Sequence, residues 1–492
     1  MNNVRAQKEN GEILFDPSIT CKDTLADCFR IFTDDQPLHS EPADRLTFVA
    51  HGLNLEQEHV TIYTDGACFN NGKANAYCGA GVWISDGHPH NRAIRVPGEH
   101  HSNQVGELVA IIEALRLTEN FKPLTIKSDS NYSIKGLTKY LATWEDNGWI
   151  GVKNSLFFRI AAALLRARTA TTKFHWVKAH RGELGNEAAD IKAKTGARKP
   201  HADELNMTIH PSFLLKGAKI ATISQSTAYK GIRERTPTKE RRTTNIHLAR
   251  AQAAVEEFTG QCETTEAMWK ATTHPDLSKK IQQFLYKCMH NCYRVGDYWA
   301  NIEGYEDRTH CKSCNHPTED LDHILTDTEC SNKAAKTIWT LARSVWPYND
   351  HSWPDINLGI IMACGALTVT HKDLQHPNAT DPQNTMADTP HAGATRLLRI
   401  LIAESAYLIW VIRCERVIQQ RTHTLKEITT RWLTTINRRL MIDRVTSCTL
   451  RRTNQYKKKL VATWGPALHA PPDDWPTNLE VLVGIEPPWL PT

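Results

Sequence analysis

Four carboxylates in the N-terminal part of the chain stand in local settings that suit metal chemistry. They are Asp65 in VTIYTDGAC, Glu107 in SNQVGELVAIIEAL, Asp129 in LTIKSDSNYSI and Asp190 in GNEAADIKAK. A single acid of this kind is more often a solvated or capping residue. Buried carboxylates repel one another and take up protons unless cations neutralise them, so four acids that converge are stable mainly as a hard-metal site. The joint pattern therefore indicates one site for divalent cations.

The elements that must position these acids can be predicted from residue periodicity. Asp65 ends a β-rich run, and Asp129 repeats this pattern of a strand followed by an acid. Glu107 opens a segment with apolar residues at helical spacing, for which Ser102 is the expected N-cap. Asp190 lies in a second helical pattern after a glycine-bounded turn. Two strand ends and two helix faces can bring the four carboxylates together.

The chemistry expected of such a site is hydrolysis of a phosphodiester. Two Mg²⁺ ions about 4 Å apart can activate water on one side of a phosphodiester and stabilise the leaving oxygen on the other.

The motifs around these acids resemble the type 1 ribonucleases H over roughly residues 58–197. The resemblance rests on YTDGAC, GAGVW, the S-N-Q-x-x-E-L-x-A helix start, SDS followed closely by an aromatic residue, a W-x3-GW pair, KN, and W-V-K-A-H-R-G ending in G-N-E-A-A-D. It implies an α/β fold, with a ribonuclease H-like mixed sheet of five strands flanked by helices. It also implies that Asp65, Glu107, Asp129 and Asp190 hold two Mg²⁺ or Mn²⁺ ions, and that His180 assists proton transfer or product release.

The same resemblance implies an RNA/DNA hybrid as the substrate. Asn103 and Gln104 match a polar pair that contacts 2′-hydroxyl groups and bases, and the 2′-hydroxyl distinguishes RNA from DNA. Trp144 and Trp149 fall in the family's hybrid-handling region, although core packing is the alternative for each. Asn154 matches a residue that seats the DNA strand. Cleavage is expected on the RNA strand, with 5′-phosphate and 3′-hydroxyl products.

The chain departs from the family pattern in two places. Gly106 directly precedes Glu107 and weakens the predicted helix start, because glycine disfavours helix. The stretch between Trp149 and Leu156 is short, and Lys153 is its only cation. A long basic protrusion is therefore absent, so strong autonomous binding of a hybrid is not expected from this stretch.

A second metal site is predicted further along the chain by three cysteines and one histidine in CKSCNHPTEDLDHILTDTEC. Such a set suits a tetrahedral structural Zn²⁺. Four unrelated buried side chains are the alternative, and His310 or His316 could replace the predicted histidine. The predicted ligands are Cys311, Cys314, His323 and Cys330.

This cysteine segment resembles the zinc knuckle that follows the polymerase in non-long-terminal-repeat retrotransposons. The later run ESAYLIWVIRCERVI resembles the tail of fungal elements of that kind. The two resemblances together imply a protein derived from a retroelement.

Length predicts two or three domains, since the chain has 492 residues. Two long helices are expected at about 394–420 and 424–447, from apolar residues at helical spacing. The expected division is an N-terminal connector (1–57), the ribonuclease H domain (58–198), a basic helical linker (199–260), a helix with the zinc knuckle (261–335), and a helical C-terminal region (336–492) with a flexible loop near 375–394.

Composition points to an intracellular protein that binds nucleic acid. The 13 cysteines lack a disulfide-like spacing and no apolar leader precedes them, which favours a reducing compartment and leaves nucleus or cytoplasm open. The longest apolar run, 397–412, is interrupted by Arg399 and Glu404 and is too short to span a membrane. The net charge is +5, and the cations gather in two runs of the sequence. Such runs either bind phosphates or are simply solvated, and both interpretations stay open. These runs are Lys230, Arg233, Arg235, Lys239, Arg241 and Arg242, and then Arg451, Arg452, Lys457, Lys458 and Lys459.

Two other functions remain open. A decayed module that binds hybrid or RNA would be expected to have lost a carboxylate, and none of the four is lost. A transposase or integrase on the same sheet architecture would not be expected to share the G-N-E-A-A-D run.

Overall fold

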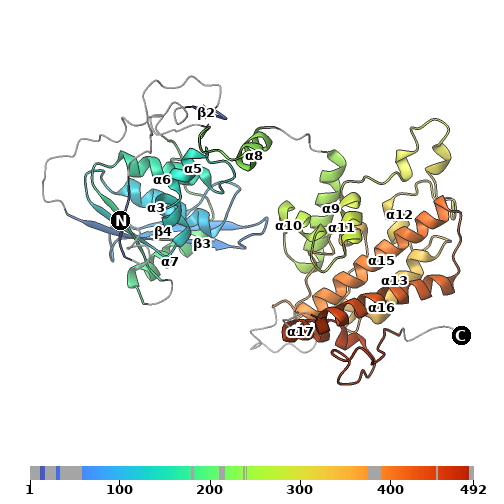
Figure 1. The fold of residues 1–492 in the computed structure, drawn as a ribbon. Helices are drawn as coiled ribbons and strands as arrows, with labels where there is room; N and C mark the ends of the chain where they lie inside the picture. Colours follow the sequence, from blue (N-terminus) through green and yellow to red (C-terminus); the bar gives the residue numbers. More distant parts are fainter. Residues whose placement is uncertain are drawn as a thin grey trace. The chain divides into compact units, whose positions relative to one another are not determined.

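The chain forms two compact units, Met1–Lys239 and Glu240–Thr492, in the computed structural model (Figure 1). Each unit has its own hydrophobic core. The boundary between them falls inside the segment predicted to be a basic linker. The structure describes residues 11–16, 29–33, 58–178, 182–209, 217–236, 239, 241–374, 389–449 and 453–486.

The first unit is built on a mixed sheet of six strands in the order β1-β7-β6-β3-β4-β5. Strands β3, β6 and β7 are parallel to one another, and the remaining pairs are antiparallel. The strands are β1 (Ile13–Leu14), β3 (Val60–Phe69), β4 (Tyr77–Trp83), β5 (Arg92–Arg95), β6 (Leu124–Ser128) and β7 (Thr172–Trp176).

The predicted fold class is confirmed, but the strand count of five is corrected to six. The additional strand is β1, in which Ile13 pairs with Phe174 and Leu14 with Lys173 at the edge of the sheet. Two residues are too few for an alternating pattern to show, so the sequence placed them in a connector.

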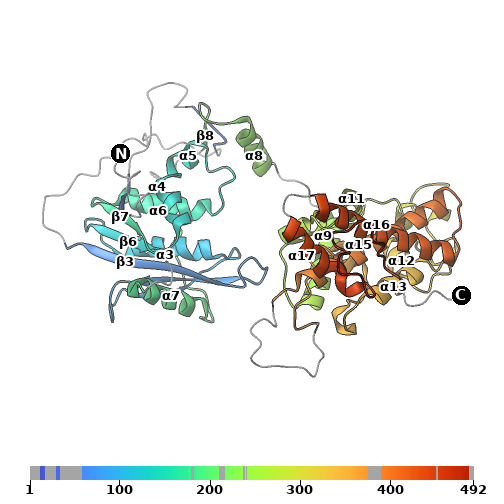
Figure 2. The ribbon, with the colours of Figure 1, turned by 60° about the horizontal axis from the view of Figure 1, so that its bottom comes forward.

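Helices cover both faces of this sheet. Figure 2 shows α3, α4 and α6 on one face and α7 on the other. The helices are α3 (Asn103–Leu117), α4 (Asn131–Thr138), α5 (Leu141–Asp146), α6 (Ser155–Ala167) and α7 (Leu184–Ala197).

Glycines allow α3 to lie unusually close to the sheet. A Cβ on Gly106 would lie 2.6 Å from the carbonyl oxygen of Gly79, and one on Gly66 would overlap the backbone nitrogen of Glu107. Gly106 therefore costs helix propensity and is needed for packing. This close approach of α3 to β3 determines how near the Glu107 backbone lies to the strand that carries Asp65.

A small two-stranded sheet and a further helix complete the first unit. β2 (Arg30–Ile31) pairs antiparallel with β8 (Ala218–Lys219), and α8 (Gln225–Arg235) follows. The pair β2–β8 joins a segment between β1 and β3 to one that follows the main sheet in sequence.

The second unit is helical, and its core surrounds the long helix α15 (Ala392–Ile418). The two predicted long helices are confirmed as α15 and α16 (Leu425–Thr449). Of the predicted loop near 375–394, residues 375–388 lie outside the described residues and 392–394 begin α15. The other elements are α9 (Arg242–Thr259), α10 (Thr265–Thr272), α11 (Lys279–Met289), η3 (Gly296–Tyr298), η4 (Glu306–Arg308), α12 (Leu321–Thr326), α13 (Ala334–Val345), η5 (Asp350–Ser352), α14 (Leu358–Met362), α17 (Thr453–Trp464) and η6 (Gly465–Ala467).

A buried ion network links the helices of the second unit. The Arg396 Nε lies 3.0 Å from the Asp276 carboxylate, and its Nη1 lies 2.7 Å from that of Asp443. Lys459 on α17 also reaches Asp276, at 2.9 Å. Among the described helices, none is both long and apolar enough to cross a membrane.

Candidate active site and metal centre

The main sheet and its two helical layers converge on the predicted acids. Asp129 directly follows β6 as predicted, but Asp65 lies within β3 and not at its end, because β3 continues to Phe69 in its pairing with β4. The parallel pairing of β3 with β6 stops at Thr64 and Ser128, so the next residues, Asp65 and Asp129, lie side by side. Glu107 lies near the start of α3, where the Ser102 hydroxyl accepts from the backbone N–H of Val105 and caps the helix as predicted.

Three of the four carboxylates are close enough to share a cation. Oxygens of Asp65, Glu107 and Asp129 all lie within 4.8 Å of one another. Asp190, on α7, lines the same cavity of about 310 Å³ together with Asn103 and the other three acids. The structure thus brings together the residues that the sequence predicted as a metal site.

Burial and mutual repulsion disfavour negative charge in this cluster. The exposed fractions of Asp65 and Glu107 are 7% and 8%. Burial, and then the charge of Asp129, raises the pKa of Asp65 to about 7. Burial and the two neighbouring aspartates raise the pKa of Glu107 well above its usual range, and the buried Glu107 Oε2 has no hydrogen-bond partner. A cation would relieve both effects, so the residues fit a divalent-metal site.

The sequence analysis assigned no role to two residues of this site. The Lys194 Nζ lies 2.7 Å from the Asp190 Oδ2, one helical turn further along α7. The buried Asn186 approaches Asp129 at 3.5 Å through its Nδ2. Lys194 could have been found from its spacing, since residues four apart share a helix face. Asn186 lies in the G-N-E-A-A-D run that the sequence analysis quoted, but its contact with Asp129 depends on how α7 packs and is not evident from the motif.

The predicted polar contacts lie beside the acid cavity. Asn103 lines it, and the next residue, Gln104, is exposed. The Asn154 side-chain amide is 3.5 Å from the Gln104 Oε1, with Asn154 in the left-handed region at φ 58°. These three residues form a continuous polar edge from the cavity to the loop before α6.

The two predicted tryptophan contacts pack in the core. Trp149 is 8% exposed, and the half-buried Trp144 ring lies 4.9 Å from that of Phe158, between ring centres. This is the packing alternative left open by the sequence. Contact of either indole with nucleic acid stays a prediction, and the predicted His180 lies outside the described residues.

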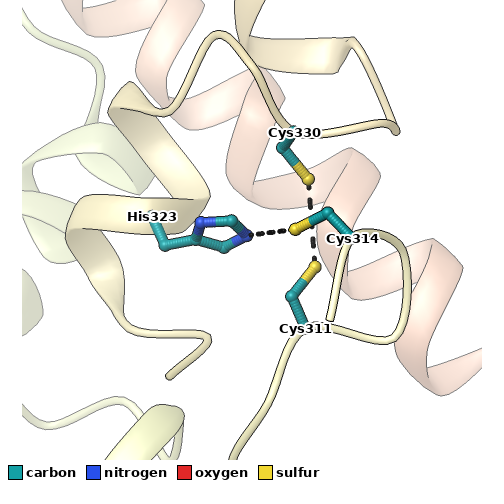
Figure 3. Close-up of side chains that lie close together, drawn as sticks. All are labelled: Cys311, Cys314, His323 and Cys330. Atoms are coloured by element: carbon teal, nitrogen blue, oxygen red, sulfur yellow. Dashed lines mark hydrogen bonds between the residues drawn. The ribbon is translucent and has the colours of Figure 1, made fainter. Parts of the chain in front are cut away.

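The second predicted metal centre also assembles, in the second unit. Ligand atoms of Cys311, Cys314, His323 and Cys330 all lie within 4.8 Å of one another (Figure 3). The sulfurs of Cys311 and Cys330 are 3.9 Å apart, and the Cys314 sulfur is 3.4 Å from the His323 Nε2. Three sulfurs and one imidazole nitrogen suit Zn²⁺.

The surroundings of this cluster select His323 over its neighbours. The His323 Nδ1 lies 2.8 Å from the Asp327 carboxylate, although the angle between them does not make a hydrogen bond, and the Nε2 on the other side of the ring faces the Cys314 sulfur. His316 instead bonds to the backbone of Thr318, and its ring stacks on that of His323. Burial opposes ionisation of Cys311, but backbone donation led by Ser313 lowers the pKa of its thiol to about 6. The geometry favours His323 as the fourth ligand.

The loop that carries Cys311 and Cys314 is anchored to α15. Arg416 donates to the Ser313 hydroxyl and lies 2.6 Å from the carboxylate of the buried Glu319. Arg413 pairs with the same carboxylate. The cysteine cluster is therefore tied to the longest helix of the second unit by one acid and two arginines.

Comparison with known proteins agrees with the fold of the first unit. The RNase H family model matches residues 57–198. Ribonuclease H of Schizosaccharomyces pombe is 39% identical over 141 residues, which cover 28% of this chain and 52% of that protein. Human Ribonuclease H1 is 34% identical over 163 residues, with coverage of 32% and 55%. Ribonuclease HI of Pasteurella multocida is 33% identical over 150 residues, with coverage of 29% and 93%.

The fold and the acid cluster are those of a ribonuclease H-like nuclease domain. Because this chain spans nearly all of a bacterial relative at 33% identity, it belongs to the ribonuclease H family. It spans about half the length of the yeast and human relatives. The second unit lies outside the matched residues.

Proposed function

We propose that this protein hydrolyses the RNA strand of RNA/DNA hybrids at the acid cluster of its first unit. The observation that carries the proposal is the convergence of Asp65, Glu107 and Asp129 within 4.8 Å, with Asp190 in the same cavity, on a ribonuclease H sheet. Divalent cations, Mg²⁺ or Mn²⁺, would supply activation of the attacking water and neutralisation of charge on the phosphate.

The residues around those cations would have different roles. Asp65 and Asp129 would hold the ions between β3 and β6, and Glu107 and Asp190 would complete the ligand set from two helices. Lys194 pairs with the Asp190 carboxylate and would compete with a cation for its negative charge. Asn103 and Gln104 would position the RNA strand, Asn154 the DNA strand, and His180 would assist proton transfer or product release.

The competing proposal is a binding module that has lost catalysis. It would predict a missing or misplaced carboxylate, whereas all four are present and line one cavity. The intact set favours hydrolysis.

We also propose that the second unit holds one structural Zn²⁺ and derives from a retroelement. The Cys3His set leaves no open coordination position, so this metal would stabilise the fold and take no part in hydrolysis. The retroelement origin is supported by the resemblance of the knuckle and of the α15 sequence to such elements.

The experiment that tests the nuclease proposal compares substrates. Purified protein is incubated with a strand-labelled RNA/DNA hybrid, duplex DNA, duplex RNA and single strands, with Mg²⁺ or with EDTA. We expect cleavage of the hybrid's RNA strand alone, and only with the metal. Metal-independent cleavage, or equal cleavage of duplex RNA, would contradict the proposal.

A further inference from the structure

Helix α8 is fixed against the loop that precedes α6. The Glu234 carboxylate accepts from the backbone N–H of Gly151 at 2.9 Å. Gly231 packs on the Ile150 side chain, since a Cβ there would lie 2.8 Å from the Ile150 Cδ1. A segment that follows the nuclease sheet in sequence thus lies beside residues within it.

The small sheet β2–β8 holds the other side of α8. Arg235 donates to the Phe32 carbonyl at 3.0 Å, and its guanidinium lies 5.0 Å from the centre of the Phe32 ring. The buried Lys219, on β8, lies 2.9 Å from the Asp146 carboxylate at the end of α5. Figure 2 shows α8 and β8 next to α5. With contacts on two sides, α8 is held in a defined orientation on the nuclease unit.

The cations that α8 presents are Lys230 and Arg233. Both are exposed, and they lie three apart, on one face of the helix. Within the described parts of the chain, neither forms an ion pair with a carboxylate. The Lys230 stem covers Gly151, because a Cβ on that glycine would lie 3.7 Å from the Lys230 Cδ. Their charges are free to meet an anion at the edge of the loop.

This cationic edge continues into the acid cavity through a chain of contacts. From Gly151 the loop runs to Lys153, whose carbonyl accepts from the Tyr132 hydroxyl at 3.1 Å. Asn154 then meets Gln104 at 3.5 Å, and Asn103 beside it lines the cavity. A nucleic acid seated at the acids would extend along this edge toward α8.

We propose that α8 is a phosphate-binding handle that takes the backbone of the RNA/DNA hybrid beyond the cleavage site. The acid cavity is lined by four carboxylates and the loop from Trp149 to Leu156 carries one lysine, so side-chain cations that contact phosphates beyond the acids must come from elsewhere. Lys230 and Arg233 supply them from outside the matched domain, at residues that follow position 198. This inference rests on the proposed function, because it names a substrate contact of the same site.

The expected effect follows from counterion release. Each phosphate neutralised contributes about 0.9 to the slope of log affinity against log salt, so loss of two contacts should lower the slope by about 1.8. Over a fourfold change in salt this difference amounts to roughly tenfold in relative affinity. The defect should therefore be largest at low salt and shrink as salt rises.

The test compares K230A/R233A with the wild-type full chain. Binding of a fluorescent long hybrid is followed by anisotropy in EDTA across a salt series, and cleavage is followed separately with Mg²⁺. The matched control is K270A/K336A, which removes two exposed, acid-paired lysines of the second unit. We expect weaker binding and a higher KM for K230A/R233A alone, an unchanged kcat, and little effect on a hybrid too short to pass the acid cluster.

Binding and cleavage are measured in separate assays, so the proposal for α8 and the nuclease proposal can be refuted independently. If K230A/R233A binds the long hybrid with the wild-type affinity and salt slope, the handle is refuted even when cleavage is normal. Absence of cleavage by the wild type would refute the nuclease proposal while the anisotropy comparison still decides the role of α8. An equal loss of binding in the K270A/K336A control would also overturn the handle, because the effect would then be one of net charge.

Discussion

Replacing Asp65 with asparagine should stabilise the metal-free protein while it abolishes catalysis. The carboxyl titrates at a pKa of about 7 in the fold, against 3.8 when unperturbed, because it is buried beside Asp129. The two values differ by about 3, which corresponds to about 4 kcal/mol at 1.36 kcal/mol for each pKa unit. This is the free energy that the wild-type fold stands to lose when Asp65 must ionise.

The direction of the pH dependence follows from proton binding. Between pH 4 and 7 the unfolded chain has lost the Asp65 proton while the folded chain keeps it, so the folded state binds more protons. The contribution of Asp65 to stability is therefore full below about pH 4 and is lost as pH rises through about 7. Asp65→Asn has no proton to lose there and should lack this component of the pH dependence.

The assay is urea denaturation in EDTA at pH 5 and pH 8, read by hydrogen exchange of the peptide that contains β3. The asparagine variant should gain stability over wild type at pH 8, and the gain should be smaller at pH 5. Added Mg²⁺ should stabilise wild type and not the variant, because binding to the folded state alone shifts unfolding by mass action. Equal stability of the two proteins in EDTA at both pH values would refute the claim that the acids repel one another.

Three further predictions concern other residues. His180→Ala should lower the cleavage rate by at most about 10² to 10⁴-fold, the range typical of general acid–base assistance, and a wild-type rate would remove His180 from the mechanism. Cys314→Ser should release zinc, by mass spectrometry, and expose 311–330 to protease, because thiolate ligation is coupled to folding. Cleavage of a short hybrid should persist in that variant, and its total loss in a folded protein would refute independence of the two units. Arg396→Ala should destabilise the second unit by about 3–5 kcal/mol in thermal unfolding, since it leaves Asp276 and Asp443 short of a buried partner. The exposed control Arg421→Ala should change stability by less than about 0.5 kcal/mol, and an equal loss would contradict the role of the network.

The acid site could be predicted from sequence because each acid is tied to a regular element. A β-rich run that leads to an aspartate and a capped helix with a glutamate are local patterns, and parallel pairing of β3 with β6 brings Asp65 and Asp129 side by side. The end of β3 was not predictable, because its continuation from Gly66 to Phe69 depends on pairing with β4. Helices α15 and α16 were likewise predictable, because their apolar residues recur over many turns.

The parts that sequence could not predict depend on contacts between distant residues. β1, β2 and β8 have two residues each, so no periodicity marks them. The position of α8 depends on Gly231 and Glu234 meeting the loop at Gly151, some eighty residues earlier. For Trp149, the motif identifies the residue but does not predict the direction of its side chain, which is buried in the core.

The most direct test of the account is strand-specific cleavage of a hybrid by wild-type, Asp65→Asn and Asp129→Asn proteins, each shown to be folded. With Mg²⁺, the wild type should cut only the RNA strand and leave 5′-phosphate and 3′-hydroxyl ends, and EDTA should stop it. Each variant should be slower by several orders of magnitude, because an amide cannot supply the negative charge that holds the ions. Robust cleavage by the Asp65→Asn protein would contradict the assignment of the acid cluster as the catalytic site.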